Sequence, residues 1–129
     1  MNMPAIQERT RKPDWMTGAP DSFAIASVHQ DQVVEVPKSG TVIASSEFCE
    51  NAAIAYDDIA LSFQGHPEFT ETYQRDLYEV RLKPIVAAPI IERARQSLAT
   101  RDADSAMVAH WIASFLKAAI ERQRAAKAA

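Results

Sequence analysis

Short apolar runs separated by polar turns fill the chain from residue 22 to residue 64. The runs are rich in Val, Ile, Ala and aromatic side chains: SFAIASV (22–28), VVEV (33–36), TVIASS (41–46), AAIAYD (52–57) and IALSFQ (59–64). PKSG (37–40) and the Asp57–Asp58 pair supply turn residues between some of them. Short runs at this spacing predict strands that are joined by hairpins.

After residue 69 the spacing of the apolar positions becomes helical. Thr70 can cap a helix that runs to about residue 83, where Pro84 ends it. Pro89 suits the first position of a second helix. A third helix follows Asp102 or Asp104, either of which can cap it. Its apolar residues are three and four positions apart: Val108, Trp111, Ile112, Phe115, Leu116 and Ala119.

The two ends of the chain lack this periodicity. Residues 1–20 are polar and interrupted by prolines, so we expect an irregular lead-in whose Trp15 and Met16 pack onto the domain. Residues 121–129 lack large apolar side chains and are expected to fray. The domain itself is predicted over 21–120.

The order of the predicted elements indicates an α/β domain, with strands over about 22–64 and three helices over about 70–120. An intact doubly wound α/β domain alternates strand and helix along the chain. Here the strands come first and the helices follow. This order is expected for the latter part of a larger domain.

Composition and charge narrow the classes of function. The chain has 129 residues, of which 47% are hydrophobic and 24% charged, as in an ordinary globular domain. Its net charge of −3, with dispersed basic residues, argues against a nucleic-acid partner. There is no signal-peptide pattern, and no apolar run approaches the roughly 20 residues that span a membrane. We therefore expect a soluble, cytoplasmic protein without a membrane partner.

Cys49 is the single cysteine, which excludes an internal disulfide and a cysteine-rich metal site. His66, Glu68 and the distant His29 lack the spacing of metal ligands. The sequence therefore predicts neither a metal nor a cofactor.

The stretch SFQGHPEF (62–69) carries the clearest candidate chemistry. Pro67 biases His66 toward extended backbone, and residues i and i+2 of an extended chain lie on the same side. The Glu68 carboxylate can then hydrogen-bond one imidazole nitrogen of His66 and leave the other to act as a general base. The triplet alone is more often a surface connection. A strand and Gly65 before it and a helix start after it make the pattern more specific.

SFQGHPEF resembles the base-and-carboxylate segment of class I glutamine amidotransferases. SVHQDQVVEVP (27–37) and TVIASSEFCENAAIAY (41–56) resemble the segments that precede it, in the same order. DADSAMVAHWIASFL (102–116) is similar to stand-alone members related to the amidotransferase domain of GMP synthase. The resemblance covers most of residues 15–119. It implies the C-terminal part of a flavodoxin-like class I amidotransferase domain.

The family resemblance also implies roles for individual residues. In that family a cysteine thiolate attacks the side-chain amide of glutamine, ammonia leaves, and water hydrolyses the thioester. His66 matches the general base and acid, and Glu68 matches the residue that orients it. His29, Gln30 and Asp31 match a segment whose backbone groups bind the amino-acid end of glutamine. For His29, a structural role at a strand end is an equal alternative.

One part of the family's machinery has no match in the sequence. The nucleophilic cysteine of the family lies in a Gly-rich elbow well before the His-Pro-Glu segment, and no glycine flanks Cys49. Cys49 matches a non-catalytic position, so we interpret it as a small, partly buried residue rather than a replacement nucleophile. We expect the chain alone to be inactive. Two alternatives stay open: a subunit that completes a separate cysteine-bearing chain, and a non-catalytic interaction protein. The ammonia acceptor is not indicated.

A domain without its N-terminal half leaves a sheet edge and a sheet face uncovered. Such apolar surfaces favour association. The sequence therefore predicts a homo-oligomer that forms through an exposed edge or face.

Overall fold

The computed structural model describes residues 5–129, and side-chain burial from Gln7 onward. The elements are, in order, β1 (Ala5–Arg9), β2 (Ser22–Ile25), β3 (Gly40–Ser45), β4 (Ala53–Tyr56), β5 (Ala60–Phe63), α1 (Glu71–Asp76), a π-helical segment η1 (Leu77–Leu82), α2 (Ala88–Thr100) and α3 (Ser105–Ala128). Strands followed by helices is the order that the sequence predicts, and the mixed α/β class is confirmed.

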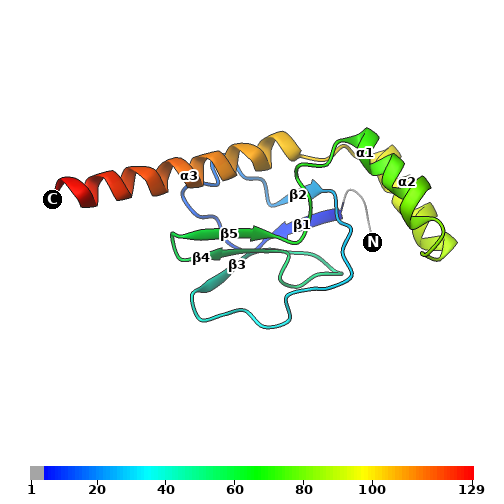
Figure 1. The fold of residues 1–129 in the computed structure, drawn as a ribbon, viewed down its shortest axis with the longest axis horizontal. Helices are drawn as coiled ribbons and strands as arrows, with labels where there is room; N and C mark the ends of the chain where they lie inside the picture. Colours follow the sequence, from blue (N-terminus) through cyan, green and yellow to red (C-terminus); the bar gives the residue numbers. More distant parts are fainter. Residues whose placement is uncertain (1–4) are drawn as a thin grey trace.

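The strands form a curled sheet in the order β2-β1-β3-β4-β5, with antiparallel pairing throughout residues 5–129. The β3–β4 and β4–β5 connections are too short for the crossover that parallel neighbours require. A further antiparallel bridge joins Ala26, just after β2, to His66, just after β5. The two edges of the sheet therefore meet at one point (Figure 1).

Two strand predictions are wrong. The lead-in predicted over 1–20 is not irregular throughout, because β1 lies within it and pairs with both β2 and β3; residues 1–4 of this lead-in lie outside the described residues. Conversely, 33–36 is not a strand. The backbone N–H and C=O of Val33 bond instead to the side chains of Gln64 and Asn51. The conformation of both segments depends on partners far away along the chain, and the local hydrophobic pattern carries no information about those partners.

The main core lies between the sheet and the first half of α3. Trp111 is fully buried and meets Phe23 edge-on, with ring centroids 5.1 Å apart and planes at 88°. The indole N–H of Trp111 donates to the carbonyl of Thr17 at 3.1 Å. Met16 is 1% exposed and Trp15 packs against Phe115. The predicted packing of Trp15 and Met16 onto the domain is therefore confirmed.

The helix predictions hold at most boundaries. Thr70 Oγ1 accepts from the N–H of Tyr73 at 3.2 Å and so caps α1, and Pro89 lies at the start of α2. The first helix changes to π-helical geometry before Pro84. η1 and α2 share a second core with the end of β2, formed by Ala26, Tyr78, Leu82, Ile91 and Ala94.

The third helix departs from the prediction at both ends. Asp104 occupies the N-cap position, but its carboxylate accepts from the N–H of Ala24 at 2.7 Å instead of capping α3. The tail 121–129 is helical to Ala128 rather than frayed. Its Ala, Arg, Gln and Lys residues are strong helix formers, so intrahelical bonds continue without packing. Figure 1 shows α3 extending well beyond the sheet.

No helix within residues 5–129 has both the length and the apolar character needed to cross a membrane.

Candidate active site

The bridge between Ala26 and His66 builds the candidate site at one end of the sheet. The N–H of His66 donates to the carbonyl of Ala26 at 2.7 Å, which fixes the backbone of the His-Pro-Glu segment against β2. Gly65 makes this approach possible. A Cβ at that position would lie 2.5 Å from Ile25 Cδ1 and 2.8 Å from the Ala26 carbonyl oxygen. A side chain there would push the two segments apart.

His66 and Glu68 form the hydrogen-bonded pair that the sequence predicts. His66 Nδ1 lies 2.8 Å from Glu68 Oε1, and because a carboxylate only accepts, Nδ1 is the donor. The two side chains are 35% and 64% exposed. Nε2 of His66 is thereby left as the nitrogen that can exchange a proton with a reactant.

The charge state of Glu68 follows from the same contact. Partial burial alone would raise the pKa of Glu68. The hydrogen bond from His66, the bond from its own backbone N–H and the charge of His66 together outweigh that effect, so the pKa is lowered from its ordinary value. The carboxylate is therefore ionised at neutral pH, as an acceptor for the imidazole must be.

An aromatic side chain covers one face of the His66 ring. Phe69 stacks on His66 with centroids 4.2 Å apart and planes at 6°. Tyr73, one helical turn later, packs its ring against Phe69 at 4.6 Å and 62°. The sequence analysis did not identify this stack, although an aromatic residue three positions after the histidine is its visible signal.

The predicted substrate residues lie on the loop that follows the Ala26 bridge. His29 Nδ1 donates to the carbonyl of Asp31 at 3.1 Å, and its ring centroid is 6.2 Å from that of Phe48. Gln30 and Asp31 are exposed. This loop therefore begins directly after Ala26, the residue at the end of β2 whose carbonyl accepts the N–H of His66. The described hydrogen bonds of His29 and His66 go to different partners, and none of them joins the two imidazoles.

Three amide side chains hold that loop in place, and the sequence analysis did not single them out. The Val33 N–H donates to Gln64 Oε1 at 3.0 Å, and the Val33 carbonyl accepts from Asn51 Nδ2 at 2.8 Å. Gln32 Nε2 donates to the carbonyl of Phe48 at 3.0 Å. Because Gln64 precedes Gly65 and His66, the loop and the His66–Glu68 pair share one anchor. An amide side chain at a strand end gives no periodic signal.

Cys49 lies in a tight turn, away from an activating group. It is 3% exposed, and its N–H donates to Ser46 Oγ at 3.0 Å. Burial raises the pKa of its thiol, and the opposing backbone hydrogen bond from Asn51 is the smaller effect. Such a thiol is protonated at neutral pH and a poor nucleophile.

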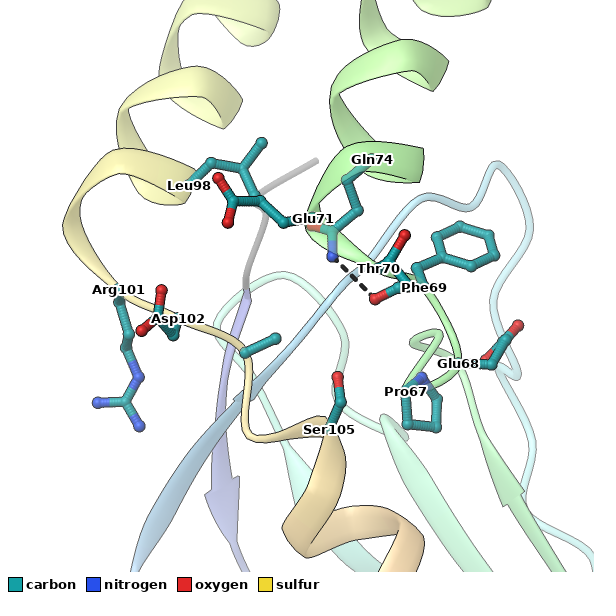
Figure 2. Close-up of a pocket in the computed structure, with 11 residues that line it drawn as sticks. Pro67, Glu68, Phe69, Thr70, Glu71, Gln74, Leu98, Arg101, Asp102 and Ser105 are labelled. Atoms are coloured by element: carbon teal, nitrogen blue, oxygen red, sulfur yellow. Dashed lines mark hydrogen bonds between the residues drawn. The ribbon is translucent and has the colours of Figure 1, made fainter.

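A cleft of about 340 Å³ lies behind the His-Pro-Glu segment, between the start of α1, the end of α2 and the start of α3. Asp102, Ser105 and Gln74 are among its lining residues. Glu68 and Phe69 also line this cleft, and Figure 2 shows their side chains directed away from those of Arg101 and Asp102. Within residues 5–129 no group of three acidic, His or Cys side chains could hold a metal ion.

Known proteins with similar sequences are named gamma-glutamyl peptidases or glutamine amidotransferase-like proteins. Gamma-glutamyl peptidase 2 of Arabidopsis thaliana is 28% identical over 117 residues, which cover 90% of this chain and 47% of that protein. Gamma-glutamyl peptidase 3 of the same plant is 30% identical over 99 residues, or 76% of this chain and 40% of that protein. A glutamine amidotransferase-like protein of Schizosaccharomyces pombe is 44% identical over 46 residues, 36% of this chain and 18% of that protein. No protein-family model matches the chain.

Solved structures give the same fold. The crystal structure of a glutamine amidotransferase from Methylobacillus flagellatus matches with a TM-score of 0.68 at 20% identity, over 90% of this chain and 52% of that one. The resemblance to class I glutamine amidotransferases is confirmed. A glutamine amidotransferase from Thermotoga maritima matches with a TM-score of 0.58 at 19% identity, over 86% of this chain and 48% of that one.

The chain spans less than half the length of the first two peptidases and about half of the solved structures. That share is consistent with a C-terminal half. The remaining half of those proteins has no counterpart in residues 5–129.

Proposed function

We propose that the chain supplies the general-base half of a site that hydrolyses a γ-glutamyl amide bond, in glutamine or in a γ-glutamyl peptide. The hydrogen bond between His66 Nδ1 and Glu68 Oε1 carries the proposal, because it orients an imidazole for proton transfer through Nε2. The names of the similar proteins support the choice of a γ-glutamyl amide as the bond that is cleaved.

The chemistry balances as a two-step acyl transfer. His66 Nε2 takes the proton of a cysteine thiol, and the thiolate attacks the γ-carbonyl carbon. The C–N bond breaks, and the imidazolium gives its proton to the leaving ammonia or amine. Nε2 then takes a proton from water, whose oxygen attacks the thioester; the C–S bond breaks, glutamate leaves, and the imidazolium returns its proton to the cysteine sulfur. The ionised Glu68 stabilises the imidazolium in both steps.

The nucleophile comes from a segment other than residues 5–129 in this proposal. Cys49 is buried, and the pKa of its thiol is raised. The similar proteins extend over about twice the length that this chain matches. A cysteine-bearing half, on the same longer polypeptide or on a separate chain, would complete the site. The proposal places the protein in the cytoplasm, where a catalytic thiol stays reduced.

The test measures glutamate release from glutamine and from a γ-glutamyl dipeptide. The chain alone is compared with a chimera in which it replaces the matching part of gamma-glutamyl peptidase 2. We expect no release from the chain alone and release from the chimera. In the chimera, His66→Ala should lower kcat by about 10²–10⁴-fold, and Cys49→Ala should have no effect.

Two results would contradict the proposal. A folded chimera without activity would show that the His66–Glu68 pair is not competent. Activity of the chain alone that disappears in Cys49→Ala would make Cys49 the nucleophile.

A second candidate, a non-catalytic oligomeric interaction protein, rests on the exposed apolar side chains. Val34 is 91% exposed, Phe48 61% and Ile59 82%. Val34 and Phe48 lie on the loops that the amide side chains join beside His66, and Ile59 immediately precedes the edge strand β5. These surfaces can receive either a second copy or a cysteine-bearing half.

A further inference from the structure

The hydrogen bond to Glu68 restrains the His66 ring only in part. A single bond joins Nδ1 to Oε1 of Glu68, whose side chain is 64% exposed, so the bond competes with water. The imidazole can still swing about its Cα–Cβ and Cβ–Cγ bonds away from the carboxylate, and this motion would move Nε2 as well. A general base needs Nε2 held toward the reacting proton, so a second restraint is required.

The Phe69 ring provides this second restraint on the orientation of the His66 imidazole. It lies parallel to the imidazole, at 6° and with centroids 4.2 Å apart, so turning His66 out of plane would break the stack. A ring flip within the plane keeps the stack but loses the bond to Glu68. The two contacts therefore restrain different motions.

Phe69 is itself held on several sides. Its N–H donates to the carbonyl of His66 at 3.3 Å, and its carbonyl accepts from Nε2 of Gln74, which is 2% exposed, at 3.2 Å. The edge contact with Tyr73 follows from the cap at Thr70, which fixes the start of α1. Figure 2 shows the bond between Gln74 and Phe69, with Glu68 and Phe69 on the same side of the segment.

We infer that Phe69 is a positioning residue that holds the plane of the His66 imidazole and thereby keeps Nδ1 within hydrogen-bond reach of Glu68. The inference rests on the proposed function for its catalytic meaning, but the ring geometry can be tested without catalysis. Phe69 touches no reacting atom and acts only through His66.

The experiment follows the imidazole nitrogens of His66 by NMR in the ¹⁵N-histidine-labelled chain at neutral pH. His66→Asn identifies the resonances among the three histidines. In the wild type we expect a single tautomer with the proton on Nδ1 and a downfield proton signal from its bond to Glu68. Phe69→Leu keeps an apolar side chain without a flat face and should lose both signatures. Phe69→Trp keeps a flat face and should retain them.

Phe63→Leu is the matched control, because it makes the same chemical change three residues before His66 without touching the stack. It should leave the His66 tautomer unchanged. If Phe69→Leu retains both signatures in a chain with a native amide spectrum, the inference is wrong. If Phe69→Leu does not fold, Tyr73→Ala removes the support of the Phe69 ring, and unchanged signatures there would equally overturn it.

The chimera separates this inference from the proposed function. Phe69→Leu should lower kcat at least tenfold and change KM less than twofold. A wild-type chimera without activity, together with the expected NMR result, overturns the proposed function and leaves the positioning role standing. A fall in kcat with an unchanged tautomer overturns the positioning role.

Discussion

Replacing Gly65 by alanine tests the contact that brings the two edges of the sheet together. The new Cβ would lie 2.5 Å from Ile25 Cδ1, 2.7 Å from Ile25 Cγ1 and 2.8 Å from the Ala26 carbonyl oxygen. The Ile25 side chain is 1% exposed and packed in the main core, and the carbonyl belongs to the backbone and accepts the N–H of His66. Segment 65–66 and the end of β2 must therefore separate.

The magnitude follows from two effects. Overpacking a well-packed core costs about 1–3 kcal/mol. A lost backbone hydrogen bond adds about 0.5–1.5 kcal/mol. We expect Gly65→Ala to lower the free energy of unfolding by about 1.5–4.5 kcal/mol, measured as the shift of the urea midpoint at constant slope.

A double-mutant cycle with Ile25→Ala isolates the cause. Removing the Ile25 side chain deletes the two nearest clashes, so the double variant should be more stable than the sum of the single changes predicts. Gly18→Ala serves as the control. Gly18 has φ of +65°, and no atom lies within 4 Å of the position that its Cβ would take, so its cost of about 1–2 kcal/mol is local and should add to that of Ile25→Ala. Additivity at Gly65, or wild-type stability of Gly65→Ala, would refute the reasoning.

Three further predictions concern the pair, its loop and the sheet edge. Because folding lowers the pKa of Glu68, its ionised carboxylate stabilises the fold above the unfolded-state pKa of about 4.3, and this stability is lost as the pH falls through the folded-state pKa. Glu68→Gln should remove that part of the pH dependence of the free energy of unfolding, measured in urea titrations at several pH values. An unchanged pH dependence would contradict the prediction. Gln64→Ala should speed hydrogen exchange of the Val33 amide about tenfold while amides in β4 keep their rates; equal protection would show that the side chain does not hold the loop. Ile59→Lys, at the exposed start of β5, should shift light scattering from oligomer toward monomer, and a wild-type monomer would overturn the proposed self-association.

The sequence alone determined the features that depend on a few neighbouring residues. Pro67 biases the backbone of His66 toward extended conformations, so the imidazole and the Glu68 carboxylate two residues later lie on the same side of the chain. Thr70 caps α1 and Pro89 starts α2 through equally local contacts. The order of strands and helices followed from periodicity, which each segment carries in itself.

Only the tertiary structure decided which distant segments meet. β1 is a strand because β2 and β3 lie on either side of it, and 33–36 is not one because two amide side chains occupy the bonds of Val33. The Phe69 stack and the fit of Gly65 against Ile25 also require three-dimensional placement. Local preferences act over a few residues, whereas partners separated by 18 or 31 positions, as those of Val33 are, become neighbours only when the chain folds.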